Sequence, residues 1–327
     1  MKMRYFAVAF ISVLAMSLWV TDASAADGKN PILEVAGNAA AEKRAEFNVA
    51  TFNLRQKNER DSLNGDNWMR RCPVIAQLIR FHEFNIFGTQ EGFKDQLEDL
   101  KSRLPNYEYT GVAREDGKNV GEHSAIFYDT TMFELLDHGD FWLSETPEKP
   151  GLGWDAACVR ICSWGKFRHR ASGKVFQFFN LHLDHVGKTA RVESVLLVQR
   201  KMKEFGLNLP TFLTGDFNVD QTHDLYEVLS ASDFLRDSFT TADFVYALNG
   251  TINSYNTEGY TESRIDHIFV TDDVAVEKYG VLTDSYRTPT DDAEAYTSSE
   301  FPEEVAFKTY RTRLPSDHFP VKIKIKL

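Results

Sequence analysis

The amino-acid sequence predicts an α/β fold in which mixed β-sheets are covered by helices. Apolar runs typical of buried strands alternate with helical spacing early in the chain, and strands predominate afterwards. A strictly parallel array would keep alternating to its end, so mixed sheets are favoured. Hydrophobic residues make up 43% of the chain and aromatic residues 13%, which supplies a dense core and excludes a disordered chain.

The first part of the chain is expected to alternate strands and helices. Residues 47–53 (FNVATFN) and 85–89 (NIFGT) are short apolar runs that predict buried strands. Between them, residues 67–82 place their large apolar side chains on one side of a helix. Residues 93–104 repeat that spacing, and Pro105 is expected to end this second helix.

The rest of the chain is expected to consist mainly of strands, with one further helix at residues 189–205. The strands are predicted at residues 107–112, 124–128, 133–136, 159–166, 175–183, 211–214, 265–270 and 319–326. No internal repeat or low-complexity linker divides the sequence. Residues 26–327 are therefore predicted to form a single domain, which we expect to be a monomer.

The first 25 residues have the pattern of an export signal. Lys2 and Arg4 give a positive start, residues 5–20 are mostly apolar, and Ala23-Ser24-Ala25 is a small-x-small cleavage site. The apolar run is short for a bilayer span, which needs about 20 residues. We expect a cleaved signal peptide over residues 1–25 and a protein exported to the periplasm or the medium; an uncleaved anchor is the alternative.

The charge of the chain disfavours a grip on long nucleic acid. The formal net charge is −11, and the signal segment carries Lys2, Arg4 and Asp22, a net +1, so the remainder carries −12. Proteins that hold nucleic acid by its phosphates usually show a basic face. The acidic net charge therefore disfavours long nucleic acid as a substrate. It does not exclude such a substrate, because a local basic groove can exist in a chain that is acidic in total.

Three cysteines are too few for a disulfide-stapled domain, which would carry more of them in an even number. Cys158 and Cys162 lie in a segment that looks extended, where strand rise would separate them by about 13 Å, too far for a bridge. We therefore expect Cys72, Cys158 and Cys162 to be free thiols, most of them buried.

Residues 286–311 are acidic and irregular. A long segment of this kind is expected to form a loop beside the functional site. Such a loop would be able to close over a small ligand.

Polar residues that suit catalysis stand where the predicted strands end, and strand ends of a sandwich share one edge. The set is Asn53, Glu91, His182, Asp184, Asp216, Asn218, Asp266, Asp317 and His318; the adjacent His267 is expected to be structural, because a strand would point it to the opposite face from Asp266. Any one of them alone is more simply explained as a turn or a cap. Together they supply the groups needed for metal-assisted attack of water on phosphorus: oxygen ligands for Mg²⁺ or Mn²⁺, a carboxylate for the water, and histidines for proton transfer.

The motifs TFN, GTQE, NLHLD, GDFN, RIDHIFV and SDHFPV occur in this order between residues 47 and 327. In this combination the sequence resembles the endonuclease/exonuclease/phosphatase superfamily, and the pairing of GDFN with a C-terminal SDH is the most specific feature. The resemblance implies a four-layer α/β sandwich, with two packed mixed β-sheets flanked by helices. It also implies a Mg²⁺- or Mn²⁺-dependent phosphoesterase.

The resemblance further implies a role for each motif residue. Glu91 corresponds to the principal metal ligand, with Asn53 and Asp317 nearby. Asp216 corresponds to the residue that positions or activates water, and Asn218 to a contact with the phosphate or the nucleophile.

Two histidine–carboxylate pairs also follow from the resemblance. His318 would contact the scissile phosphate and be oriented by Asp266, and His182 would lie near the leaving group with Glu122 as its partner. A carboxylate fixes the imidazole tautomer and stabilises its cation. We expect both pairs within hydrogen-bond reach, roughly 2.6–3.2 Å.

One position departs from the family pattern. Several nucleases carry an acidic residue two positions after the first Asn, where this chain has Arg55. This puts a second metal site in doubt and suggests a cation that faces a substrate anion; a solvated surface arginine is the alternative. Arg160 and His185 are further candidates for substrate contact.

The leading hypothesis is a hydrolase that acts on a small phosphoester, such as a sugar, nucleotide or lipid-headgroup phosphate. A secreted nuclease is the alternative within enzymes, but no basic track or aromatic platform is evident as a cluster. A catalytically inactive binding module fits less well, because such a protein would be expected to have lost Glu91, Asp216 or His318.

Overall fold

The computed structural model describes residues 44–290, 295–296, 302 and 304–327. These residues belong to one compact unit. The predicted signal peptide, residues 1–25, lies outside the described residues. Within the part that is described, no helix has the length and apolar character needed to cross a membrane.

The first large sheet has seven strands in the order β10-β12-β17-β1-β2-β4-β3. At its centre, β1 (Glu46–Asn53) runs parallel to β2 (Ile86–Gln90) and antiparallel to β17 (Val321–Lys326). The other strands are β3 (Tyr107–Thr110), β4 (Ile126–Asp129), β10 (Phe244–Tyr246) and β12 (Ala275–Val281).

The second large sheet has six strands in the order β5-β6-β7-β8-β11-β9. Here β7 (Val175–His182) and β8 (Thr211–Asp216) are parallel, and β11 (Asp266–Val270) is antiparallel to β8. The other strands are β5 (Phe133–Trp142), β6 (Ile161–His169) and β9 (Arg236–Asp237).

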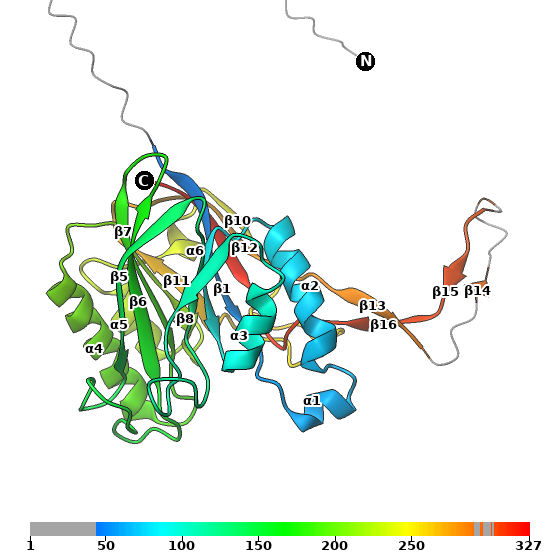
Figure 1. The fold of residues 1–327 in the computed structure, drawn as a ribbon, viewed down its shortest axis with the longest axis horizontal. Helices are drawn as coiled ribbons and strands as arrows, with labels where there is room; N and C mark the ends of the chain where they lie inside the picture. Colours follow the sequence, from blue (N-terminus) through cyan, green and yellow to red (C-terminus); the bar gives the residue numbers. More distant parts are fainter. Residues whose placement is uncertain (1–43, 291–294, 297–301, 303) are drawn as a thin grey trace, which may run out of the picture. The chain divides into compact units, whose positions relative to one another are not determined.

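The two sheets pack face to face, and helices cover their outer faces (Figure 1). An apolar cluster rich in phenylalanine, including Phe47, Phe176 and Phe212, fills the space between the sheets. Helices α2 (Trp68–Phe81) and α3 (Lys94–Lys101) pack on the first sheet, and α4 (Lys188–Phe205) and α5 (Asp224–Ser230) pack on the second. Two short helices, α1 (Glu59–Leu63) and α6 (Ser238–Thr241), lie in connections. This arrangement confirms the predicted four-layer α/β sandwich.

The segment expected to be an irregular loop forms paired strands instead. In it, β13 (Tyr286–Pro289) pairs with β16 (Tyr310–Arg313), and β14 (Ala295–Tyr296) pairs with β15 (Phe307–Lys308). Neither pair joins a large sheet. The prediction was wrong for these strands because most of their side chains are polar or exposed, so no alternating apolar pattern marks them.

The three cysteines are free, as expected, and Cys72 and Cys162 are buried. Cys162 lies within β6, and Cys158 lies in the segment before that strand.

A buried amide on β7 connects the two sheets. The Asn180 Nδ2 donates to the carbonyl oxygens of Thr89 at 2.9 Å and Ala125 at 3.0 Å, which belong to the first sheet and its edge. The Asn180 Oδ1 accepts from the Gln90 side chain at 2.7 Å and from the Thr214 hydroxyl at 3.0 Å. This fully buried amide therefore uses both of its N–H donors and both acceptor positions of its oxygen, and its partners lie on β2, on β8 and directly before β4.

The backbone of β2 approaches this amide so closely that only glycine fits beside it. A Cβ added to Gly88 would lie 2.2 Å from the Asn180 Oδ1. The two sheets are thus held by a specific polar contact as well as by apolar packing.

We predict that Asn180→Leu lowers the free energy of unfolding by roughly 2–4 kcal/mol, because buried polar partners lose their hydrogen bonds. Urea denaturation with matched m-values measures the effect. Asn119→Leu, at an exposed position, is the control. Equal stability losses in the two variants would show that the buried amide does not hold the sheets.

Candidate active site

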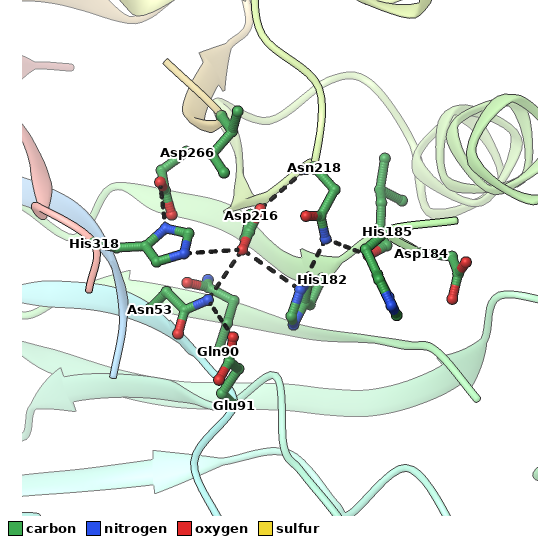
Figure 2. A network of polar contacts seen from close by, with 12 residues as sticks. Asn53, Gln90, Glu91, His182, Asp184, His185, Asp216, Asn218, Asp266 and His318 are labelled. Carbon is green, nitrogen blue, oxygen red and sulfur yellow. Dashed lines mark hydrogen bonds and ion pairs between the residues drawn. The ribbon is translucent and has the colours of Figure 1, made fainter. Parts of the chain in front are cut away.

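Strand ends from both sheets meet at one edge (Figure 2). Strand β1 ends at Asn53, which pairs in register with Gln90 at the end of β2, and Glu91 follows directly. In the second sheet, Asp216 at the end of β8 pairs with His182 of β7 and with Asp266 of β11. The remaining candidates, Asp317 and His318, lie just before β17.

Asn53 is the side chain that links the two sheets at this edge. Its Nδ2 donates to the Glu91 Oε1 at 2.9 Å and to the Asp216 Oδ2 at 3.0 Å. Its Oδ1 accepts from the backbone N–H of Arg55 at 2.9 Å. The amide is fully buried, so Asn53 holds two carboxylates in place from beneath the site.

His318 has the carboxylate partner that was expected. Its Nδ1 lies 2.9 Å from the Asp266 Oδ2, and both side chains are buried. Burial lowers the pKa of His318, but the charge of Asp266 and this hydrogen bond raise it, and the resulting pKa lies well above the ordinary value. His318 is therefore an imidazolium whose Nε2 lies 3.8 Å from the Asp216 Oδ2.

Asp216 has a carboxyl group that binds a proton unusually tightly. Burial and then the charge of Asp266 raise its pKa to about 7, although the His318 cation opposes that rise. A group with this pKa gains and loses a proton near neutral pH, which is the property required of a general base.

His182 does not have the partner that was expected. Its Nδ1 lies 3.9 Å from the Glu122 Oε2, which is too long for a hydrogen bond. Glu122 instead accepts from the Arg114 Nη1 at 2.6 Å, because a guanidinium offers it a charge-assisted hydrogen bond. The His182 Nε2 accepts from the Asn218 Nδ2 at 3.0 Å and lies 3.4 Å from the Asp216 Oδ2.

The surroundings of His182 favour its neutral form. Burial, followed by the nearby charges of Arg160 and Arg114, lowers the pKa of His182 well below the ordinary value. With Nε2 accepting from Asn218, the ring proton stands on Nδ1, which has no hydrogen-bond partner among the described residues.

The Arg55 side chain lines the cavity and is fixed by two carboxylates, so it is not a solvated surface residue. Its Nε contacts the Asp61 Oδ2 at 2.9 Å, and its Nη1 contacts the Asp317 Oδ2 at 3.3 Å. Asp61 lies in α1, so this short helix positions the guanidinium. A positive charge therefore occupies the place beside Asp317 where family nucleases were expected to carry an acid.

Arg160 and His185 form a second polar group at the site. The buried Arg160 donates from Nη2 to the His185 Nδ1 at 3.1 Å and from Nε to the Asp184 Oδ2 at 3.4 Å. Asp184 also accepts from the backbone N–H groups of Val186 at 2.9 Å and Gly187 at 2.8 Å. Although burial opposes it, these donors lower the pKa of Asp184, which stays ionised and shapes the turn that presents His185.

A cavity of about 510 Å³ lies over these groups. It is lined by Arg55, Gln56, Glu91, Arg114, Glu122, Cys158, Arg160, His182, His185, Asp216, Asn218, Ile252, Ile265, Asp317 and His318. Ten of the twelve predicted site residues are in this lining; Asn53 and Asp266 instead contact lining residues from behind. The described part of residues 286–311 contributes no lining residue, so the expected position beside the site was wrong for that part.

Sequence reasoning missed Arg114, Gln56, Cys158, Ile252 and Ile265. Arg114 stands in a charged run (ARED) in a connection, where no strand end or motif singled it out. Gln56 follows the first motif closely, so proximity to Asn53 and Arg55 was the available signal.

The donor set at the centre of the cavity fits a hard divalent cation. Ligand atoms of Glu91, Asp216 and His318 lie within 4.8 Å of one another. Burial and the interaction with Glu91 raise the pKa of Asp317, although the charges of His318 and Arg55 oppose that rise, so Asp317 and Glu91 repel each other across the cavity. Glu91, Asp216 and Asp317 offer the oxygen ligands that Mg²⁺ and Mn²⁺ prefer, whereas the His318 imidazolium is set to donate hydrogen bonds.

Comparison with known proteins assigns the chain to a family. The model of the Endonuclease/Exonuclease/phosphatase family matches residues 47–318. The chain belongs to this family. Its members hydrolyse phosphoesters, which agrees with the predicted reaction type.

Solved structures of other family members are similar over nearly their whole length. A family protein from Bacteroides thetaiotaomicron is 53% identical with a TM-score of 0.81, covering 87% of this chain and 98% of that one. A structure described as a mannosyl-6-phosphatase of the same species is also 53% identical, with a TM-score of 0.79 and coverage of 85% and 99%. A family protein from Bacteroides vulgatus is 37% identical, with a TM-score of 0.74 and coverage of 86% and 98%.

We predict that Asp266→Asn lowers the pKa of His318 and reduces phosphoester turnover by roughly 10- to 100-fold, as removal of a carboxylate behind an active-site histidine commonly does. NMR titration of the metal-free protein measures the pKa, and hydrolysis of 4-nitrophenyl phosphate measures turnover. Asp233→Asn, at an exposed position, is the control. An unchanged His318 pKa in Asp266→Asn would contradict the assigned electrostatic role.

Proposed function

We propose that this protein is an exported, divalent-metal-dependent phosphatase that hydrolyses small phosphoesters, with phosphorylated sugars as the first class to test. The observation that carries the proposal is the composition of the cavity. The lining of this cavity of about 510 Å³ combines several carboxylates that suit a divalent cation with three arginines. That volume suits one phosphorylated small molecule.

Two features of the cavity argue against a nucleic-acid substrate. Among the described residues, those that line the cavity include no Phe, Tyr or Trp. The lining therefore offers no aromatic side chain on which a nucleic-acid base would stack. Each lining arginine also contacts a carboxylate: Arg55 contacts Asp61 and Asp317, Arg114 contacts Glu122, and Arg160 contacts Asp184. Little uncompensated positive charge remains for a second phosphate of a strand.

The mannosyl-6-phosphatase at 53% identity supports a small phosphorylated substrate. The N-terminal signal motif in residues 1–25 supports export. The net charge of −11 supports a small substrate over a polyanion, because long-range repulsion slows the capture of a polyanion.

In the proposed mechanism, Glu91 and Asp317 would hold the cation, and Asn53 fixes the positions of Glu91 and of Asp216. When bound, the cation supplies positive charge to the phosphate oxygens. Asp216 takes the proton of the attacking water from a position set by Asn53. The His318 imidazolium, held by Asp266, donates a hydrogen bond to a phosphate oxygen as negative charge develops there.

His182 and Asn218 supply the remaining side chains of the proposed mechanism. The Asn218 Nδ2 donates to the His182 Nε2 at 3.0 Å and to the carbonyl oxygen of Leu183 at 2.9 Å, so its Oδ1 is left to accept a hydrogen bond from the attacking water. His182, whose Nε2 lies 3.4 Å from the Asp216 Oδ2, is proposed to face the departing oxygen and to pass to it the proton that Asp216 takes from water.

The test of the proposed function is a substrate panel at matched Mg²⁺ and low salt, with EDTA as the negative control. The panel contains 4-nitrophenyl phosphate, hexose 6-phosphates, bis(4-nitrophenyl) phosphate, nucleoside monophosphates and supercoiled plasmid. We expect hydrolysis of the small esters that EDTA abolishes. Efficient plasmid nicking without small-ester turnover would favour the secreted nuclease, and no hydrolysis of any substrate would favour an inactive binding module.

We predict that Glu91→Gln weakens Mn²⁺ binding by at least roughly tenfold and lowers turnover at limiting Mg²⁺, because a neutral amide replaces an anionic ligand. Calorimetric titration measures the affinity, and circular dichroism checks the fold. Glu108→Gln, at an exposed position, is the control. Full turnover of Glu91→Gln at limiting Mg²⁺ would remove Glu91 from the ligand set.

A further inference from the structure

One part of the cavity lining has no role in the proposed water attack. It consists of Arg114, Glu122, Arg160 and His185, which we call the polar wall. Its four side chains come from the connection before β4, the segment before β6 and the turn after β7. Glu122 belongs to this group by geometry, because it contacts Arg114 at 2.6 Å and is 3.9 Å from His182.

The polar wall begins where the reacting phosphate would lie. Its link to the catalytic group is His182, which contacts Asn218 and Asp216 through Nε2 and faces Glu122 through Nδ1. A group joined to the phosphate through one oxygen would therefore extend along the polar wall. The wall is thus placed to contact the part of the substrate that leaves.

The polar wall carries little net charge. The Arg114 guanidinium is paired with Glu122 at 2.6 Å, and the Arg160 guanidinium lies 3.4 Å from the ionised Asp184. A second phosphate or a carboxylate would gain little attraction from arginines that are already paired, and it would be repelled by Glu122. The charges therefore favour a neutral polar group over a second anion.

The polar wall presents both hydrogen-bond donors and hydrogen-bond acceptors. His185 accepts from Arg160 at Nδ1, so its proton stands on Nε2, and the side chain is exposed at the cavity. The Arg160 Nη1 is a buried donor without a partner among the described residues. Glu122 is an acceptor, and its Oε2 receives a hydrogen bond from the Arg114 Nη1 at 2.6 Å. A hydroxyl group both donates and accepts, so neighbouring hydroxyls match such a surface.

We propose that the polar wall is a sugar-binding subsite, in which Arg114, Glu122, Arg160 and His185 bind hydroxyl groups of a phosphorylated sugar. This inference rests on the proposed phosphatase function and adds the residues that select the leaving group. The wall distinguishes a sugar phosphate from an aryl or alkyl phosphate of similar size. A buried site that hydrogen-bonds a substrate hydroxyl disfavours an analogue that lacks it, since the protein groups are then left unpaired.

The test compares mannose 6-phosphate with 4-nitrophenyl phosphate, which carries no sugar hydroxyls. In Arg114→Met and in His185→Ala, we expect the ratio of kcat/KM for mannose 6-phosphate to that for 4-nitrophenyl phosphate to fall by roughly tenfold or more. Arg168→Met, an exposed arginine on β6 paired with Glu134, should keep the wild-type ratio. Because His185 is exposed, His185→Ala keeps the test valid if Arg114→Met does not fold.

Saturation-transfer NMR with free mannose separates this inference from the proposed function. Binding of mannose to the wild type, and its loss in His185→Ala, would support the subsite even if no phosphoester were hydrolysed. An equal loss of activity on both substrates would assign the wall to the phosphate and overturn the inference. A preference for fructose 1,6-bisphosphate that disappears in Arg114→Met would also overturn it, by showing a second anion site.

Discussion

The site depends on the buried amide of Asn180, which fixes one sheet against the other. Its partners Thr89 and Gln90 end β2 and directly precede Glu91, while Thr214 lies two residues before Asp216. Asn180 itself lies two residues before His182 on β7. Apolar packing alone would tolerate a small slip between the sheets, but a slip would leave this amide unsatisfied. The distances of about 3 Å from Asn53 to two carboxylates on different sheets follow from that constraint.

Backbone strain at the strand ends is the second constraint on the site. Arg55, Glu91 and Asn218 have φ angles of 56°, 64° and 52°, and all three line the cavity. Non-glycine residues rarely adopt this left-handed region, so the surrounding structure must hold them. Arg71 does this for one side: its fully buried guanidinium donates to the carbonyl oxygens of Arg55 at 3.0 Å and Pro315 at 3.1 Å. It thereby ties the end of β1 to the loop that carries Asp317 and His318.

The sequence allowed prediction of the parts of this structure that periodic patterns or adjacent residues determine. Apolar runs predicted mixed sheets covered by helices, whereas the two packed sheets and the Asp266–His318 contact followed from the resemblance of the motifs to the family. The partner of Glu122 was not predictable, because Arg114 lies eight residues earlier in an irregular connection whose path is set by tertiary packing. The strands between residues 286 and 313 also escaped prediction, since they pair with each other without burying an apolar face.

The two buried histidines show how neighbouring charges assign different tasks to the same side chain. Burial lowers the pKa of both His182 and His318, so burial cannot distinguish them. Asp266 reverses that effect for His318, which becomes a cation beside the Asp216 carboxyl group. For His182, Arg160 and Arg114 add to the effect, and it stays neutral and free to accept from Asn218. Because those same arginines form the polar wall, the residues proposed to select the leaving group also set the protonation of the histidine beside it.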